Sequence, residues 1–293
     1  MNKLLITRWN GRILTALRSE KRVLEIGLEE EESILGNIYI GRVQKIVKNL
    51  NAAFVDFAEG RTGYYSLDDN PAALYGNGQA GAGKLREGDE IVVQVARDAV
   101  KTKEPVLTSN LNFTGKYAVV TSGKKGIGFS SRIQDKEFKE RLRPRIQEVI
   151  GDEVGVIVRT NAYGMEKELL ADIHGLMEQY RRIREKAAYR TRYSVLSKAE
   201  PEYIKTLKGC LNGSVEEIIT DDPEIYEDVR AYLETEVRGG WGLESGLRSG
   251  LRLYQDSLVS LNKLYSLDTV MEQALQRKVW LKSGGYLVID VTE

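Results

Sequence analysis

The sequence predicts a multidomain α+β protein with a small β-barrel in its first half. The stretches 36–43 and 51–65 carry the β-branched and aromatic residues of strands, and their glycines allow a bend and a tight turn. Farther along, apolar residues recur at helical spacing from Met165 to about Ala188, which indicates a long amphipathic helix. The 293 residues are enough for two or three domains and an ample core.

Three strands are expected before the barrel, at 4–9, 12–17 and 22–27. The dipeptide Asn10-Gly11 joins the first two and is typical of tight hairpin turns. The acidic run 29–32 is interpreted as a solvated connector rather than a site.

The barrel is expected to extend from residue 36 to about 119. Its candidate strands are 37–48, 51–57, 61–66, 90–97 and 105–109. The residues expected to fill it are Val43, Ile46, Phe54, Val55 and Phe57. The glycine-rich run 77–83 is predicted to be a flexible surface insertion, because no Gly-Lys-Ser/Thr follows it as a phosphate-binding loop requires.

The same barrel has the residue types of a nucleic-acid surface. Oligonucleotide-binding barrels stack bases on aromatic rings while cations pair with the phosphates. Phe54 and Tyr64 supply rings, and the nearby cations are Arg42, Lys45, Lys48 and Arg61. The pattern therefore predicts RNA or another single-stranded nucleic acid as the ligand.

A third unit is expected at about 116–192. It has strands at 117–121 and 154–159, a helix over 135–150 with a bend at Pro144, and then the long helix. That helix ends among cations and tyrosines: Arg181, Arg182, Arg184, Lys186, Tyr189, Arg190, Arg192 and Tyr193. Two interpretations stay open, a helix end that favours the macrodipole and a contact strip for phosphates or a neighbouring domain.

The remainder is again α/β. The expected elements are helices at 202–211, 223–236 and 267–275, strands at 216–220 and 251–254, a loop over 238–250, and a hairpin of 278–281 with 285–290 turned by Ser283-Gly284. The sequence ends soon after the last strand, so we expect a truncated β-unit.

Composition excludes several classes of protein. Lys plus Arg and Asp plus Glu are 43 each, so a nucleic-acid binder must gather its cations on one surface. The single Cys210 excludes an internal disulfide and a four-cysteine zinc site, and the single His174 excludes a two-histidine metal site. No apolar run resembles a signal peptide or membrane span, so we expect a cytoplasmic protein without a membrane partner.

The sequence contains only weak residue patterns of the kind that form catalytic sites. Asp221-Asp222 precedes Pro223, where Asp is a common turn or cap residue, and Asp290 and Glu293 point to opposite faces of an extended chain. Arg159 and Thr160 follow a strand and suit a terminal phosphate, although a structural arginine is the simpler interpretation of the local pattern.

Several longer motifs follow one another along the chain in the order that is typical of a known protein family. They are Gly36-Asn-Ile-Tyr-Ile-Gly-Arg-Val43, Ala52-Ala-Phe-Val-Asp56, Ile157-Val-Arg-Thr160, Ala274-Leu-Gln-Arg-Lys-Val279, Leu281-Lys-Ser-Gly-Gly-Tyr-Leu-Val-Ile-Asp290 and Thr292-Glu293. With them the chain resembles the N-terminal portion of the ribonuclease E/G family of bacterial endoribonucleases.

The resemblance implies a domain plan. An RNase H-like subdomain is split between 1–34 and 200–275, an S1-type OB barrel occupies 35–118, a 5′-phosphate sensor occupies 119–199, and 276–293 begin a truncated DNase I-like domain. It also implies site residues: Arg159, Thr160 and, less closely matched, Arg132 for an RNA 5′-monophosphate, and Phe54, Tyr64 and Lys103 for RNA on the barrel.

The resemblance further implies an Mg²⁺-dependent nuclease for single-stranded, preferably 5′-monophosphorylated RNA in RNA processing and decay, with a homo-oligomer possible for the full-length protein. The family's metal-binding carboxylates lie beyond Glu293, so this chain is expected to hold no Mg²⁺, to have no catalytic residue and to bind RNA without cutting it. A non-catalytic RNA-binding or regulatory protein of the same fold, and a ribosome-associated translation factor, are the alternatives.

Overall fold

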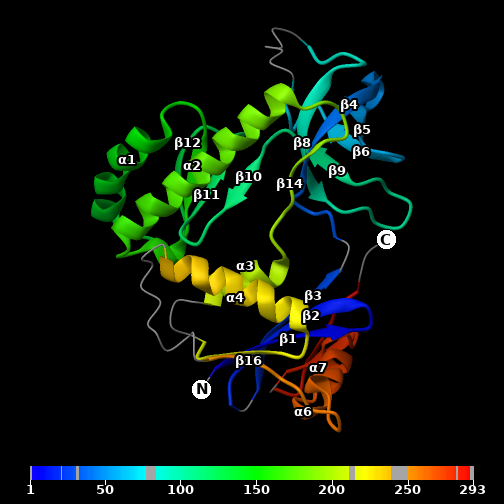
Figure 1. The fold of residues 1–293 in the computed structure, drawn as a ribbon, viewed down its shortest axis with the longest axis vertical. Helices are drawn as coiled ribbons and strands as arrows, with labels where there is room; N and C mark the ends of the chain where they lie inside the picture. The colour runs from blue at the N-terminus through cyan, green and yellow to red at the C-terminus, as the bar shows by residue number, and fades with distance from the viewer. Residues whose placement is uncertain are drawn as a thin grey trace. The chain divides into compact units, whose positions relative to one another are not determined.

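The computed structural model describes residues 2–20, 22–30, 33–76, 84–210, 215–238, 250–281 and 283–290. The glycine-rich run 77–83, most of the predicted loop 238–250 and the motif Thr292-Glu293 lie outside these residues. The chain forms two units, Met1–Glu31 with Glu202–Glu293, and Glu32–Pro201. The predicted mixture of helices and strands is confirmed (Figure 1). No helix among the described residues is long and apolar enough to cross a membrane.

The first unit contains a mixed sheet in the order β16-β15-β1-β2-β3. Its strands are β1 (Lys3–Trp9), β2 (Arg12–Arg18), β3 (Val23–Glu30), β15 (Glu217–Thr220) and β16 (Leu251–Leu253). Asn10 and Gly11 both have positive φ, 49° and 75°, which is the backbone that the predicted hairpin turn requires. β1 runs parallel to β15, so the two distant segments of the unit share one sheet.

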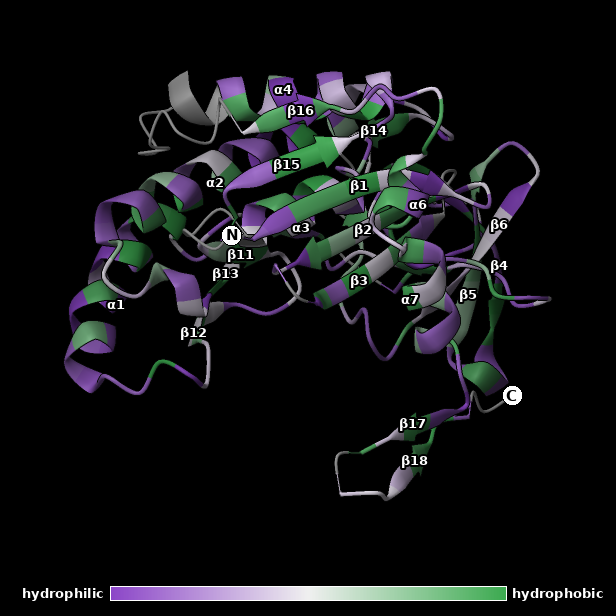
Figure 2. Cartoon of the chain, turned by 90° about the horizontal axis from the view of Figure 1, so that it is seen from below, coloured by the Kyte–Doolittle hydropathy of each residue, from purple (hydrophilic) through white to green (hydrophobic). Residues whose placement is uncertain are grey.

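Helices cover both faces of this sheet. On one face α3 (Glu202–Cys210) and α4 (Pro223–Arg238) pack against Leu4 and Ile6, and on the other α6 (Leu261–Leu264) and α7 (Leu267–Ala274) pack against Leu5 (Figure 2). This follows from the alternation of side chains along a strand. A separate hairpin of β17 (Lys278–Trp280) and β18 (Tyr286–Val288) has only exposed residues.

The second unit begins with a closed five-stranded barrel in the order β4-β5-β6-β9-β8, with β8 pairing back to β4. Its strands are β4 (Ile38–Val47), β5 (Ala52–Ala58), β6 (Arg61–Ser66), β8 (Glu90–Arg97) and β9 (Val106–Thr108), and short strands β7 (Leu74–Tyr75) and β14 (Val195–Ser197) extend the sheet. β4 pairs with β8 before Arg42 and with β5 after it. A Cβ on Gly41, next to this change of partner, would lie 2.5 Å from Val55, so the close approach needs glycine.

The barrel is consistent with an OB-like fold and is filled by apolar side chains. Val43, Val55 and Phe57 are buried in its interior as predicted, and Ile46 packs against them. The Tyr65 hydroxyl donates to Ser109 Oγ at 2.9 Å, and burial raises the pKa of Tyr65 to about 12. The boundary proposed between barrel and sensor domains at 118/119 stays a prediction.

Beyond the barrel lies a four-stranded sheet in the order β10-β11-β13-β12. Its elements are β10 (Asn112–Thr114), β11 (Ala118–Thr121), β12 (Gly126–Phe129), α1 (Lys136–Ile150), β13 (Gly155–Val158) and α2 (Glu166–Tyr189). β12 and β13 are parallel neighbours connected through α1. α2 lies along β10 and β11 and buries the apolar series predicted from its periodicity, from Leu169 to Ala187 (Figure 1).

Candidate nucleic-acid interface

The predicted RNA-binding residues lie on the outside of the barrel. β-sheet register places Lys45 opposite Phe54, Phe54 opposite Tyr64, Tyr64 opposite Val106, and Val106 opposite Arg97. Directly opposed residues point to the same face of a sheet. The five side chains therefore form a transverse row, which we call the barrel row, with a cation at each end and two aromatic rings between them.

The rings of the barrel row are only partly covered. Phe54 and Tyr64 are half-buried, and their centroids are 6.3 Å apart with an interplanar angle of 77°. Lys45 and Arg97 are exposed. The prediction that Phe54 helps to fill the barrel is wrong, because Ala53, Val55 and Phe57 point inward and Phe54 alternates with them.

Lys103 occupies an exposed turn next to this row. It follows Lys101, which has a positive φ of 54°, and its backbone pairs with Val100. The next residues of the chain lead into β9, and Pro105 O, just before that strand, accepts the Tyr64 N–H at 2.8 Å. The predicted trio of Phe54, Tyr64 and Lys103 therefore comes from adjoining segments of the barrel, whereas Arg97 was not predicted from the sequence.

The second candidate site lies where β12 and β13 end. Parallel strands end at the same edge of a sheet, and ligands of α/β sheets commonly bind at that edge. Phe129 is paired with Val158, so Ser130 and Arg159 leave the two strands side by side. The Ser130 and Thr160 hydroxyl oxygens are 2.8 Å apart, and the Arg132 N–H lies 3.4 Å from Ser130 Oγ.

Arg159 is held at this edge by backbone groups. Its N–H donates to Tyr117 O and its Nη1 donates to Gly115 O, both at 2.8 Å. The side chain is half-buried, whereas Arg132 and Thr160 are exposed. One guanidinium donor is thus used for orientation, and a guanidinium has five N–H donors in all. The structure brings Arg159, Thr160 and the Arg132 backbone together.

Three further residues belong to this edge and were not predicted. Ser130 bridges Thr160 and Arg132, as described above. Asn161 Nδ2 donates to Lys116 O at 2.6 Å, while Asn161 Oδ1 is buried and accepts from no described residue. Lys116 is only 8% exposed, and its Nζ lies 5.2 Å from the centre of the Tyr117 ring. The positive charge of Lys116 makes this edge more suitable for an anion.

The carboxylates of the described residues do not fit a magnesium centre. No group of three or more His, Cys, Asp or Glu side chains among them is arranged to hold a metal ion. Asp222 pairs with Arg8, Asp290 pairs with Arg277, and Asp221 accepts from Thr7 Oγ1 at 2.7 Å. Asp221, Asp222 and Asp290 are therefore engaged in structural contacts, and Glu293 lies outside the described residues.

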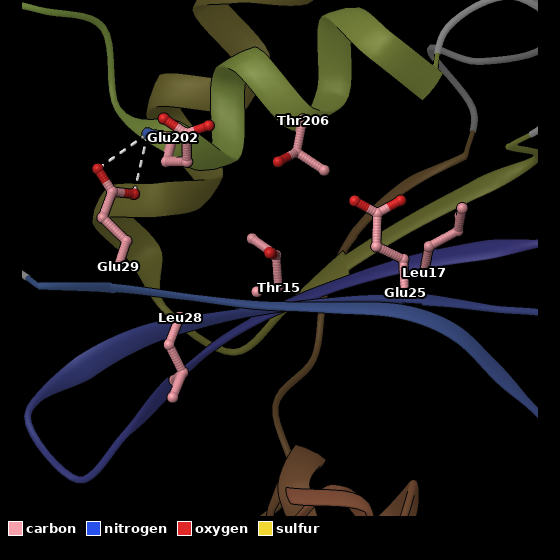
Figure 3. Close-up of a pocket in the computed structure, with 8 residues that line it drawn as sticks. Thr15, Leu17, Glu25, Leu28, Glu29, Glu202 and Thr206 are labelled. Atoms are coloured by element: carbon pink, nitrogen blue, oxygen red, sulfur yellow. Dashed lines mark hydrogen bonds between the residues drawn. The ribbon is translucent and has the colours of Figure 1, made fainter. Parts of the chain in front are cut away.

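A small cavity in the first unit is lined mainly by acidic and hydroxyl side chains (Figure 3). Glu29 accepts the Glu202 N–H with both carboxylate oxygens at 2.9 Å, which caps α3. Burial raises the pKa of Glu29, although the hydrogen bonds from the backbone act to lower it. Thr15 and Thr206 approach the same space from the sheet and from α3. Glu29 is therefore engaged in capping the helix.

Comparison with known proteins gives a consistent result. The model of the ribonuclease E/G family matches residues 112–293. The chain is 29% identical over 282 residues to ribonuclease G of Salmonella typhimurium (strain SL1344), covering 92% of this chain and 56% of that protein. It is 28% identical over 288 residues to ribonuclease E of Haemophilus influenzae, covering 95% and 30%, and 26% identical over 284 residues to ribonuclease E of Nostoc sp., covering 96% and 40%. The chain thus spans about half the length of ribonuclease G and less of ribonuclease E.

Proposed function

The chain belongs to the ribonuclease E/G family, and from this premise we propose that it binds single-stranded RNA and senses a 5′-monophosphate. The proposed setting is an Mg²⁺-dependent endoribonuclease that acts in RNA processing and decay. The relatives named above are ribonucleases, which supports an RNA ligand for this chain. The further expectations of a cytoplasmic location and a homo-oligomeric full-length protein stay predictions.

The barrel row is the observation that carries the RNA-binding proposal. Every base has a π-face, so two half-buried rings that face outward can stack with single strands with little sequence preference. Lys45 and Arg97 lie at the two ends of the row, and in this proposal they pair with phosphates on either side of the stacked bases. A duplex keeps its bases stacked inside, and the row therefore favours unpaired RNA.

The edge of β12 and β13 supports the 5′-phosphate proposal. A terminal phosphate has three acceptor oxygens and more negative charge than an internal phosphodiester. Arg159 offers remaining N–H donors, Ser130 and Thr160 offer hydroxyls, and Arg132 and Lys116 add positive charge. Charge-assisted hydrogen bonds of this kind are stronger than neutral ones, so the edge is suited to distinguish a 5′-monophosphate from a 5′-hydroxyl.

For catalysis, we propose that the described residues bind RNA without cutting it. Hydrolysis with a metal-activated water requires carboxylates that converge on the ion. Asp222, Asp290 and Asp221 instead contact Arg8, Arg277 and Thr7, and no three acidic, histidine or cysteine side chains among the described residues are grouped to hold Mg²⁺. A non-catalytic regulatory protein of the same fold makes the same contacts with RNA and is the alternative.

The deciding experiment compares two RNAs of identical sequence, one with a 5′-monophosphate and one with a 5′-hydroxyl. We expect Arg159→Ala to weaken binding of the phosphorylated RNA by about 1–3 kcal/mol, the usual value of a charge-assisted contact. Binding of the hydroxyl RNA should change little. Arg22→Ala, at an exposed position in the other unit, is the control. Equal losses for both RNAs would rule out the phosphate site and leave the barrel row untouched.

A further inference from the structure

We propose that the C-terminal third of α2 and the residues after it form a second contact for the RNA backbone, which we call the cationic strip. It consists of Arg181, Arg182, Lys186, Tyr189, Arg190 and Arg192. The inference rests on the proposed RNA binding, and it adds a surface separate from the barrel row and from the edge of β12 and β13. Its ligand is the phosphate backbone of single-stranded RNA, which it binds irrespective of the base sequence.

Charge is concentrated on this part of a neutral chain. Residues 178–193 contain six cations, the five arginines 181, 182, 184, 190 and 192 together with Lys186, and only two acids, Glu178 and Glu185. The whole sequence has equal numbers of cationic and acidic residues. Such segregation is the expected mark of a phosphate-binding surface in a protein without net charge.

The strip points outward. Ile183 and Ala187 turn to the protein and are buried, whereas Arg182 and Lys186 are exposed one helical turn apart. Tyr189 continues the same side and is 89% exposed. An aromatic ring so poorly covered contributes little to folding, but it offers a stacking face between cations.

The helix macrodipole does not explain the pattern. Its effect is limited to the last turn, where Lys186 is the basic residue. Arg181 and Arg182 come before that turn, and Arg190 and Arg192 follow the helix. The ion pairs are also weak: Arg181 lies 3.9 Å from Glu153 and Arg182 lies 3.5 Å from Glu178, all at exposed positions.

The strip is fixed to the barrel at its end. Tyr193 has a positive φ of 68°, unusual for a bulky residue, and its N–H donates to Ile40 O of β4 at 2.7 Å. Ile40 N–H donates in turn to Ser194 O at 3.0 Å. The Arg192 guanidinium lies 5.4 Å from the centre of the Tyr193 ring. The cations therefore sit on a rigid connection between α2 and the barrel, which suits an RNA longer than the barrel row alone accommodates.

The test compares the wild type with the triple variant Arg182→Gln, Lys186→Gln, Arg190→Gln. Two RNAs are titrated at several salt concentrations, a short one of about six nucleotides, within the site size of one OB fold, and a long one of about 30 nucleotides. For the long RNA we expect about a tenfold or greater loss of affinity at low salt, and a salt slope smaller by about 0.7 for each lost phosphate contact. The short RNA should bind as before.

The control variant Arg22→Gln, Arg230→Gln, Lys263→Gln removes the same charge from exposed positions of the other unit. A strip variant that matches this control on the long RNA, in both affinity and salt slope, overturns the inference and leaves the proposed function intact. A wild type that binds neither RNA overturns both. Tyr189→Ala should lower the affinity for the long RNA only, and thermal unfolding of each variant verifies that the fold is retained.

Discussion

At the scale of single residues, Phe54 shows how the two faces of one strand differ in their surroundings. Strand β5 alternates between buried Ala53, Val55 and Phe57 and partly exposed Phe54 and Asp56. Phe54 shares the side of Asp56, a polar residue, so the sequence already contained the signal that this ring faces outward. Residue type alone predicts Phe54 both as a barrel-filling residue and as an RNA contact, and the register with its partial exposure shows that it lies on the outer face of the barrel.

This difference predicts opposite outcomes for two similar substitutions. Phe54→Ala should weaken single-stranded RNA binding by about 1–3 kcal/mol, the usual value of one stacked base. Phe57→Ala, the matched control on the buried side, should instead lower the free energy of unfolding by about 3–5 kcal/mol. RNA titration and urea denaturation of both variants measure the two effects. If Phe54→Ala unfolds as readily as Phe57→Ala and keeps its RNA affinity, Phe54 is a packing residue.

Lys116 gives a second prediction at this scale. Lys116 is only 8% exposed as a residue and its Nζ lies 5.2 Å from the centre of the Tyr117 ring, while its backbone O accepts from Asn161 at the edge of β12 and β13. Lys116→Met keeps the buried apolar stem and removes the charge, so it should leave the fold intact and reduce the preference for 5′-monophosphorylated RNA by roughly 1–3 kcal/mol. Denaturation with and without inorganic phosphate tests this. The wild type should gain stability from phosphate and the variant should gain less; an equal gain would contradict a role for Lys116 at the phosphate site.

At the scale of elements, strong local patterns predicted the long strands and helices. The Asn10-Gly11 hairpin, the barrel strands, α1 and α2 all occur within a few residues of their expected limits. The short elements β7, β10, β12, β14 and α6 were not predicted, because elements this short are stabilised by their neighbours rather than by a periodic sequence. The most important missed element is β12. Because this strand was not expected beside β13, the sequence did not predict that Ser130 and Arg159 leave two neighbouring strands side by side.

The junction of β1, β15 and α4 predicts a pH dependence. Asp222 Oδ1 accepts the N–H groups of Glu224 at 2.8 Å and Ile225 at 3.1 Å, and Oδ2 accepts from Arg8. Burial opposes ionisation, but Arg8 and the backbone donors outweigh it and hold the pKa of Asp222 below its usual 3.8. The stabilisation contributed by ionised Asp222 is therefore complete above the unfolded pKa of 3.8. It is lost as the pH falls through the lower pKa that Asp222 has in the folded protein.

Asp222→Asn should consequently lower the unfolding free energy at neutral pH by about 1–3 kcal/mol. The difference from wild type should shrink as the pH falls through the lowered pKa of Asp222, because the carboxylate of the wild type is then also protonated. Denaturation curves from neutral to acidic pH measure it. Glu227→Gln, at an exposed position on α4, is the matched control. A constant difference across the whole pH range would show that the charge of Asp222 is not what stabilises the junction.

At the scale of the whole molecule, the second unit is an insertion whose ends meet. Ile38, at the start of β4, is paired with Ser197 of β14, and Ala199 N–H donates to Asn37 Oδ1 at 2.7 Å. The first unit is closed independently by the parallel pairing of β1 with β15. Adjacent ends are typical of domains that fold after insertion into another domain.

We therefore expect residues 33–201 to fold alone. The fragment keeps the barrel core, α1, α2 and the β4–β14 pairing, so it should unfold cooperatively in urea and show the proposed preference for 5′-monophosphorylated RNA. A shorter fragment, 43–201, loses the half of β4 that pairs with β8 and β14, and should not close the barrel. If residues 33–201 are unfolded, the insertion depends on the first unit. If they fold but no longer discriminate the 5′ end, recognition requires residues outside the second unit, and the phosphate site at the edge of β12 and β13 is incomplete.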